Sequence, residues 1–491
     1  MSRRLLTLTL LLAAATAGAQ TSAPTTQAMD YLRGMLSNPS ARLAALEAFQ
    51  TTQDKDLLPI FVAVAQKGET PQRLQALGIM ADLGGAAAVP VLQERLKNDP
   101  QSLAKAEALA RLVVLKGVTA EQLTELLKSE DEVIRCIAAR ALIKQGLFTQ
   151  ASPALTALTG SSDLTTASLA RMSLLGAGDK TRAAELDKTL ADPNTPAFIL
   201  SMLMEQIVEE KIAPAADLAK RLAENAPSVP VKIRACRALA AVSPSAAGVL
   251  LDAIQKNDQT VFRLQLLRTL ADLSDGKAQL QTLAAGNDPV ALLARFELAR
   301  AAGGAEATVA ANAAIAPGHR VVLEYFLDAA AKDIAASPAK AEFYVPALAE
   351  LIRSTDPNAT VIKFQHSYAV KAATLLADLG SEQALKVLAA FLTGPYNATQ
   401  RSVAAAMAWS KNPAVCPMMR PLLASPYEDL STDAALSLGR LGDAAAKPAL
   451  EEILANPNRY SRQLSALAGW YLIKMSGQSP AAVKELADSI K

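Results

Sequence analysis

Residues 135–146 read Arg135-Cys136-Ile137-Ala138-Ala139-Arg140-Ala141-Leu142-Ile143-Lys144-Gln145-Gly146, and residues 73–84 repeat the same pattern of arginine, small and apolar residues and a closing glycine. Similar stretches return about every thirty residues along the chain, and such a period is typical of repeat proteins. Each unit of a repeat protein buries its apolar face only against its neighbours. The stretch therefore predicts one elongated stack of helices instead of several separate domains.

The ends of the expected helices carry regular marks. Glycine closes the first helix of a pair because it adopts the left-handed conformation without a steric cost, and proline is tolerated in the first turn of the second helix. The marks are Gly84, Gly117, Gly146, Gly176 or Gly178, Gly276, Gly303, Gly380 and Gly442, with Pro90, Pro153, Pro346 and Pro448. They predict an all-α fold, a right-handed α-solenoid of stacked antiparallel helix pairs that runs as an open superhelical rod over residues 29–491.

The turns between units favour one repeat family. Asp131-Glu132-Val133-Ile134-Arg135 and Asp258-Gln259-Thr260-Val261-Phe262-Arg263 place an acidic residue, a valine and an arginine at the start of a helix. This pattern resembles the short bacterial HEAT repeats, such as the HEAT-like repeats of phycobilisome lyases, and the alternative architecture is the tetratricopeptide repeat. We expect Asp131, Arg135, Asp258 and Arg263 to brace neighbouring repeats, at about 0–1 kcal/mol for an exposed pair.

The N-terminus has the features of an export signal. Arg3 and Arg4 precede a short apolar run, and Ala17-Gly18-Ala19 offers a cleavage site. We expect residues 1–19 to be a signal peptide that is cleaved after Ala19, residues 20–28 to be a flexible segment, and the protein to be periplasmic or secreted. The apolar run is shorter than the ~20 residues that a membrane-spanning helix needs, and no later segment lacks charge for that length.

Charge and cysteine content narrow the classes of partner and site. Without Arg3 and Arg4 the chain keeps 47 basic residues against 47 acidic ones, so it lacks the basic surface that nucleic acid requires. The three cysteines, Cys136, Cys236 and Cys416, are separated by three or more repeats, too far apart for disulfides between stacked helices. We expect them to be buried free thiols.

The repeat pattern loosens over residues 312–366, where aromatic residues and both histidines, His319 and His366, occur. Two interpretations stay open for this region. Large side chains fill the wider space that a degenerate repeat leaves between layers, or they form a site grafted onto the scaffold. For the second interpretation the candidate partner-binding residues are Tyr325, Tyr344, His366 and Tyr368.

Known catalytic and metal-binding patterns are absent from the sequence. It holds no nucleophile elbow, no P-loop and no dinucleotide fingerprint, and two histidines with three scattered thiols do not form an ordinary metal site. The sequence predicts a non-catalytic scaffold or adaptor, without a cofactor, that binds a protein or peptide on its concave face, and it leaves self-association open. The alternative is a cofactor-handling, lyase-like protein that uses the region near residues 319–368.

Overall fold

The structure is a computed structural model that describes residues 22–226, 228–244, 246–316, 318–353, 362–393 and 396–490. These residues form α-helices joined by short turns and 3-10 segments, and the described ranges contain no strand. The expected all-α solenoid of paired helices is confirmed. The chain divides into two compact units, unit 1 with Met1–Val91 and Ala330–Lys491, and unit 2 with Leu92–Ala329.

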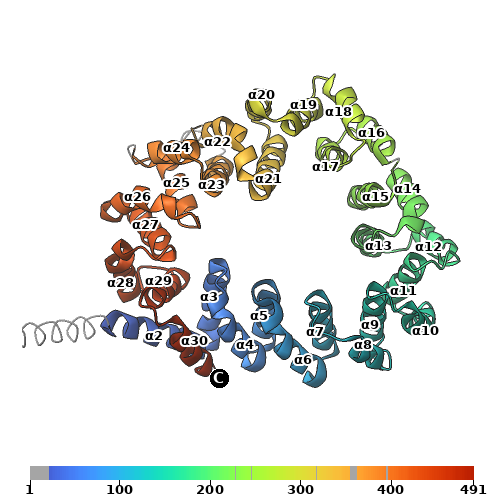
Figure 1. Ribbon diagram of the computed structural model, residues 1–491, viewed down its shortest axis with the longest axis horizontal. Coiled ribbons are helices and arrows are strands. Elements are labelled where there is room, and N and C mark those ends of the chain that lie inside the picture. The colour runs from blue at the N-terminus through green and yellow to red at the C-terminus, as the bar shows by residue number, and fades with distance from the viewer. Residues whose placement is uncertain are drawn as a thin grey trace, which may run out of the picture. The chain divides into compact units, whose positions relative to one another are not determined.

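Unit 2 is a continuous run of helix pairs. Its first helices contact one another in chain order, and each second helix packs against the first helix of its own pair, of the next pair, or of both. In Figure 1 the first helices from α13 to α17 lie on the inner side of the curve of this unit, and α12, α14 and α16 lie on the outer side. The helices are α7 (Ser102–Val114), α8 (Ala120–Leu126), α9 (Glu132–Lys144), α10 (Phe148–Leu158), α11 (Leu164–Gly176), α12 (Arg182–Ala191), α13 (Ala197–Glu210), α14 (Ala216–Asn225), α15 (Val229–Val242), α16 (Ala246–Lys256), α17 (Thr260–Ala271), α18 (Lys277–Ala284), α19 (Pro289–Ala302) and α20 (Gly304–Ile315).

Unit 1 combines both ends of the chain. Helices α6 (Val89–Asn98) and α21 (Arg320–Ala336) cross the boundaries between the units. The remaining helices of unit 1 are α2 (Ser22–Ser37), α3 (Pro39–Thr52), α4 (Leu58–Lys67), α5 (Thr70–Gly84), α22 (Val345–Arg353), α23 (Ile362–Leu379), α24 (Glu382–Leu392), α25 (Ala398–Met407), α26 (Cys416–Met419), α27 (Glu428–Arg440), α28 (Lys447–Ala455), α29 (Arg462–Met475) and α30 (Ser479–Asp488).

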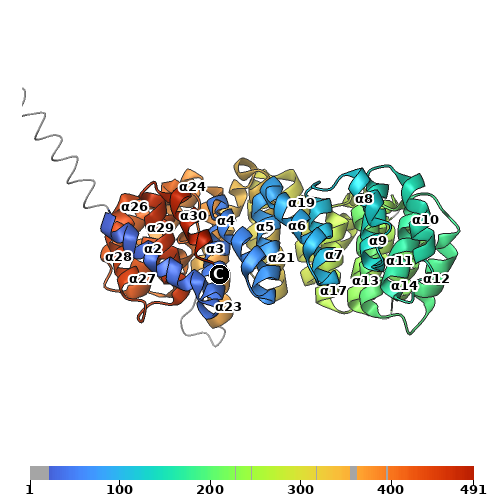
Figure 2. The ribbon, with the colours of Figure 1, turned by 90° about the horizontal axis from the view of Figure 1, so that it is seen from below.

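The two ends of the chain pack against each other inside unit 1. Helix α29 contacts both α2 and α3, and α30 contacts α2 and α4, so α3 follows α29 in the inner row as the next repeat would. Figures 1 and 2 both show these helices side by side. We call this junction, formed by α2–α4 on one side and α29–α30 on the other, the seam. The prediction of an open rod is therefore wrong for the two ends of the chain, because the terminal repeats pack against each other.

The seam also includes part of the N-terminal segment. Residues 20–28 are predicted to be flexible, and this stays a prediction; the structure describes a helix, α2, that begins at Ser22. Ala28 and Leu32 of α2 are fully buried, and a Cβ atom placed on Gly469 of α29 would lie 3.4 Å from Cγ of Leu32. Packing against α29 thus holds α2 in a helical conformation from its first described residue.

Most of the predicted marks stand at helix ends. Gly146, Gly178, Gly303, Gly380 and Gly442 have positive φ angles after their helices. Two marks are wrong. Gly276 precedes α18 instead of closing a helix, and a side chain there would meet the carbonyl oxygen of Leu270 at 2.0 Å from its Cβ atom. Pro153 lies inside α10 because that helix begins earlier, at Phe148.

Polar contacts brace the repeats in part as predicted. Arg263 forms an ion pair with Asp288 of the next repeat at 2.7 Å. Asp131 caps α9 through the amides of Val133 and Ile134 and accepts a hydrogen bond from Ser102 of the preceding repeat.

The other two predicted braces act differently. Arg135 donates to the carbonyl oxygens of Ser129 and Glu130 at 2.6 and 2.9 Å, and so stabilises the turn before its own helix. Asp258 forms no side-chain hydrogen bond or ion pair within the described residues. Only part of the acidic and basic pattern at the turns therefore links neighbouring repeats.

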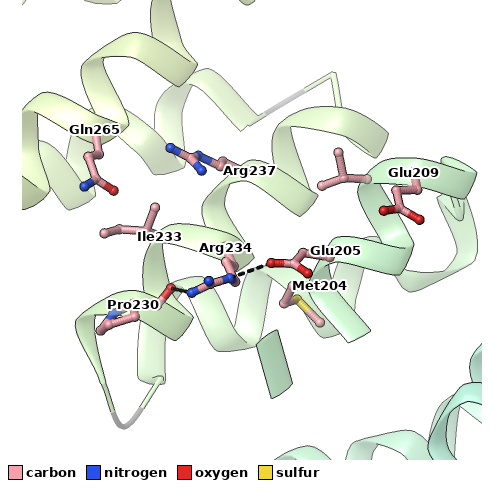
Figure 3. Close-up of a pocket in the computed structure, with 9 residues that line it drawn as sticks. Met204, Glu205, Glu209, Pro230, Ile233, Arg234, Arg237 and Gln265 are labelled. Atoms are coloured by element: carbon pink, nitrogen blue, oxygen red, sulfur yellow. Dashed lines mark hydrogen bonds and ion pairs between the residues drawn. The ribbon is translucent and has the colours of Figure 1, made fainter. Parts of the chain in front are cut away.

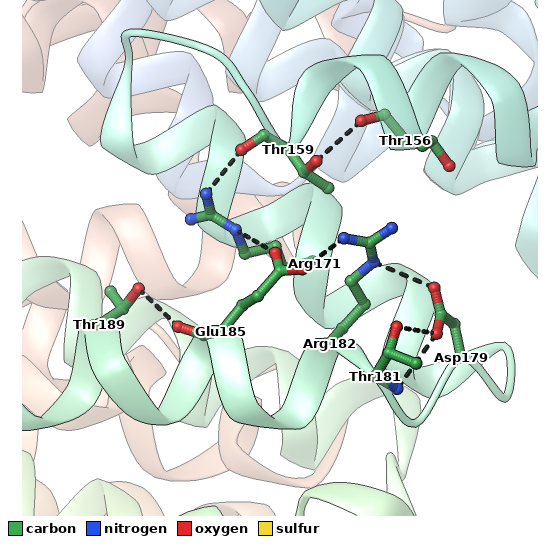
Figure 4. A network of polar contacts seen from close by, with 8 residues as sticks. All are labelled: Thr156, Thr159, Arg171, Asp179, Thr181, Arg182, Glu185 and Thr189. Atoms are coloured by element: carbon green, nitrogen blue, oxygen red, sulfur yellow. Dashed lines mark hydrogen bonds and ion pairs between the residues drawn. The ribbon is translucent and has the colours of Figure 1, made fainter.

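One brace joins α10, α11 and α12 through a chain of charges, shown in Figure 4. Arg171 of α11 donates to the carbonyl oxygen of Thr159 at 2.6 Å and pairs with Glu185 of α12 at 3.0 Å. Arg182 pairs with the same Glu185 at 2.5 Å and with Asp179 at 3.0 Å. A single carboxylate thereby fixes the angle between two neighbouring helices.

Candidate protein-binding groove

A hollow of unit 2 lies on the inner row of helices, between α13 and α15 (Figure 3). Its volume is about 490 Å³. Each of these helices buries one apolar stripe against its neighbours and turns a second, mixed face outward, as amphipathic helices in stacked layers do. The hollow is lined by Met204, Glu205, Val208, Glu209, Pro230, Ile233, Arg234, Arg237 and Gln265.

A second hollow of about 350 Å³ continues from the first toward α21. The two hollows share Arg237 of α15 and Gln265 of α17, so they form one groove across α13, α15, α17 and the part of α21 in unit 2. The second hollow adds Val261, Leu264, Arg268, Val321, Glu324, Tyr325 and Asp328. We call the two hollows together the inner groove.

The floor of the inner groove is apolar and partly open to solvent. Met204, Ile233 and Leu264 are buried beneath it, whereas Val208 is 39% exposed and Val261 is 52% exposed. Exposed valines beside a hollow offer apolar surface that a partner can cover. The groove therefore supplies both shape and apolar contact area.

The inner groove carries arginines on its two middle helices, α15 and α17, and acidic residues on the outer two, α13 and α21. Glu205 on α13 pairs with Arg234 on α15 at 2.8 Å, and Arg268 on α17 pairs with Asp328 on α21 at 3.2 Å. Within the described part of the chain, the exposed side chain of Arg237 has neither a hydrogen bond nor an ion pair. Arg237 thus remains available to a carboxylate from outside the chain.

Tyr325 lines the inner groove but is only 5% exposed. Its hydroxyl donates to Oε1 of Glu297 at 2.7 Å, and the guanidinium of Arg268 lies 4.6 Å from the centre of its ring. Burial, with the nearby carboxylate of Glu297, raises the pKa of Tyr325 well above its ordinary value. The ring packs and orients Arg268, and the exposed contacts come from its neighbours.

The other predicted site residues lie in unit 1. Tyr344 is fully buried and its hydroxyl donates to Oδ2 of Asp333 at 2.8 Å. Tyr368 is 8% exposed in α23. His366 belongs to the same helix, but its side chain lies outside the described residues. The three tyrosines are thus core residues in the structure, as the packing interpretation of the irregular region predicts, and their role in partner binding stays a prediction.

The side chains considered for chemistry are dispersed. His319 is exposed next to the start of α21, where its carbonyl oxygen accepts the amides of Val322 and Leu323. The cysteines are free and buried, as predicted. Burial raises the pKa of the Cys136 thiol to about 11 and that of Cys236 to about 12.

The described ranges contain neither a candidate metal site nor a candidate membrane-spanning helix. No group of three or more His, Cys, Asp and Glu side chains among these residues could hold a metal ion. None of the helices there combines the length and apolar character needed to cross a membrane.

Apart from Tyr325, the residues of the inner groove were not predicted as a site. Glu209 looks like an ordinary solvated residue of a helix, and Arg234 looks like part of an apolar repeat helix. The sequence signal that could have indicated the groove is the place of each residue within its helix. Glu205, Arg237 and Arg268 are each the ninth residue of their helix, α13, α15 and α17, and aligning the helix starts places them in one row across the inner helices.

The helix pairs and the groove on their inner row define the class of the protein, an α-solenoid. Residues 394–469 match the family model of HEAT repeats, as the resemblance implied. No curated protein matches the chain.

Several solved structures are similar to the chain at low identity. Kap121p is 12% identical with a TM-score of 0.37, over 95% of this chain and 58% of Kap121p. The UNC-45 chaperone, whose structure concerns the binding and folding of muscle myosin, is 13% identical with a TM-score of 0.30, over 93% of this chain and 67% of UNC-45. The chain spans little more than half the length of Kap121p. No function follows from similarities at this level.

Proposed function

We propose that the protein is a non-catalytic scaffold that binds a segment of a protein partner in the inner groove. The observation that carries the proposal is the combination, in one groove, of exposed valines with the unpaired Arg237. Apolar anchors surrounded by polar side chains are the usual composition of protein interfaces.

The charge pattern of the groove describes the partner. Acidic residues lie on α13 and α21, and arginines lie on α15 and α17 between them. Packed helices are about 8–10 Å apart, and an extended chain covers about 3.3 Å per residue. A segment with an acidic residue in the middle, basic residues toward both ends and apolar residues between them would complement the groove.

Substitutions in the groove test the proposal. Val208→Asp places a charge on the apolar floor, and Val309→Asp, on the 69% exposed Val309 of α20, is the matched control outside the groove. Loss of a buried valine contact costs about 1.5–3 kcal/mol, so Val208→Asp is expected to lower recovery of a native partner at least tenfold in quantitative affinity purification. Equal recovery with both variants would reject the inner groove as the binding site.

We propose further that the protein works outside the cytoplasm, after cleavage behind Ala19. Support comes from the basic start, the apolar run and the small residues at the cleavage site within residues 1–19. Cell fractionation with intact-mass measurement tests this, and the expected mature chain begins at Gln20. A cytoplasmic protein that keeps residues 1–19 would contradict it.

A further inference from the structure

The seam joins helices that lie far apart in the sequence, so only non-covalent contacts hold them together there. In the inner row of unit 1, α23, α25, α27, α29, α3 and α5 contact one another in this order. Chain connections join the neighbours of this row except at the step from α29 to α3, where the hydrogen-bonded residues are more than 400 positions apart. We infer that the seam is also an interface for a second copy of this chain, formed when two copies exchange helices α2–α4.

The apolar centre of the seam is too large to remain open to water. Trp470 of α29 and Phe49 of α3 are both 0% exposed, and their rings meet edge to face with centroids 6.3 Å apart. Leu32 of α2 packs beside Gly469 of α29. A chain with an open seam would expose these side chains as one patch, and such patches drive association.

Polar contacts make the two faces of the seam specific for each other. Oδ2 of Asp54 accepts the indole N–H of Trp470 at 3.2 Å and pairs with the ammonium of Lys474 at 2.6 Å. Gln463 donates to Glu47 at 2.6 Å, and Arg33 pairs with Glu485. A random apolar surface would leave these groups without partners, whereas the same face of a second copy would satisfy all of them.

The α2–α4 face of the seam differs from the α29–α30 face, and each copy of the chain carries both faces. If α2–α4 of one copy cover α29–α30 of another, the reverse exchange can cover the remaining pair of faces, which gives a closed dimer. The exchanged dimer can form two seams with the contacts that two closed monomers have, provided that the packing of α3 and α4 on α5, which includes the bonds of Gln72 with Arg42 and Pro39, is kept or formed again. The protein concentration during folding then decides whether the closed monomer or the exchanged dimer forms. The rate of closure within one chain does not depend on concentration, whereas exchange between two chains becomes faster as concentration rises.

Both species should persist once formed. Conversion of one into the other requires a seam to open, which exposes Trp470 and Phe49 to water. Helices α2–α4 are also synthesised long before α29 and α30, so their seam face is exposed until α29 and α30 have been made. Exchange is therefore expected during folding and not between folded molecules.

The test uses two differently tagged forms of the mature chain. They are unfolded, mixed and refolded together at low and at high concentration, and the products are measured by size-exclusion chromatography with light scattering. We expect a species of doubled mass that carries both tags, that increases with concentration and that survives tenfold dilution. Native forms mixed without unfolding are expected to give no species with both tags. Monomer alone at every concentration would overturn the inference.

A locked variant distinguishes the seam from other surfaces. Leu32→Cys with Gly469→Cys places two thiols across the seam, and oxidation of the folded monomer closes it covalently. The oxidised form, denatured and refolded without reductant, should stay monomeric, and reduction before refolding should restore the dimer. A dimer of equal amount from the oxidised form would show that another surface forms it. Trp409→Phe leaves Trp470 as the single tryptophan, and its fluorescence reports whether each variant closes the seam.

Discussion

Replacement of Trp470 by alanine should open the seam while the rest of the solenoid stays folded. The side chain of Trp470 is completely buried against Phe49 and donates its indole N–H to Asp54. Truncation of a buried aromatic side chain to alanine costs about 3–5 kcal/mol. Asp54 keeps its ion pair with Lys474, so the lost hydrogen bond adds only about 1 kcal/mol.

This cost should be local to unit 1, because the seam lies wholly within that unit. Hydrogen exchange with mass spectrometry measures it helix by helix. We expect the protection of the amides in α3 and α29 to fall roughly 1,000- to 25,000-fold in Trp470→Ala, as about 4–6 kcal/mol implies, and that of α13 and α15 in unit 2 to change little.

The matched control is Trp409→Ala. Trp409 is 42% exposed, and its main described contact is the guanidinium of Arg440 at 5.6 Å from the ring centre, which is worth about 0.5–1 kcal/mol. Trp409→Ala should therefore change the protection of the α3 amides little. Unchanged protection of α3 and α29 in Trp470→Ala would refute the reasoning, and so would an equal loss of protection in α13 and α15.

Three further predictions concern single side chains. Burial, together with the nearby Asp429, raises the pKa of Asp433 to about 7, while in the unfolded chain it is near 4, so the native state loses stability as pH rises from about 4 to 7. Asp433→Asn should remove this loss and stabilise the protein by on the order of 2 kcal/mol at pH 8, but not at pH 4, and equal denaturation midpoints of both proteins at pH 8 would contradict it. Burial keeps the thiols of Cys136 and Cys236 protonated, with pKa values of about 11 and 12, so a thiol reagent at pH 8 should label them only after denaturation, and rapid labelling of the native protein would contradict their burial. Gly380 has φ +63°, and a Cβ atom there would lie 2.6 Å from the side-chain amide nitrogen of Asn412, so Gly380→Ala should cost roughly 1–2 kcal/mol in chemical denaturation, and a cost below 0.5 kcal/mol would be inconsistent with this geometry.

The local features of the fold could be predicted from the sequence because their causes are local. The glycine after a helix, the proline in its first turn and the capping aspartate each act within a few residues, and Gly442, Pro448 and Asp131 stand where such rules place them. The exceptions have tertiary causes. Gly276 is required by a close approach of the Leu270 carbonyl, which no local pattern shows.

The seam and the inner groove could not be predicted in the same way. Trp470 and Asp54 meet across 416 positions, and neither lies in a stretch that indicates a distant partner. Aromatic residues suit both a core and a pocket, so the sequence left two interpretations of Tyr325 and Tyr344 open, and burial of both side chains follows only from the packing of neighbouring repeats. Arg237 lies on an exposed helix face like many other arginines.

Site-specific photo-crosslinking tests most directly the central claim that partners bind in the inner groove. A photoreactive amino acid replaces Val208 or Val261 in the groove, or Val309 outside it, and crosslinked partners are identified by mass spectrometry from cells that express each variant. The account predicts that one protein is crosslinked from both groove positions and is absent or at least tenfold weaker at position 309. Crosslinks of equal strength at all three positions, or crosslinks at position 309 alone, would contradict it.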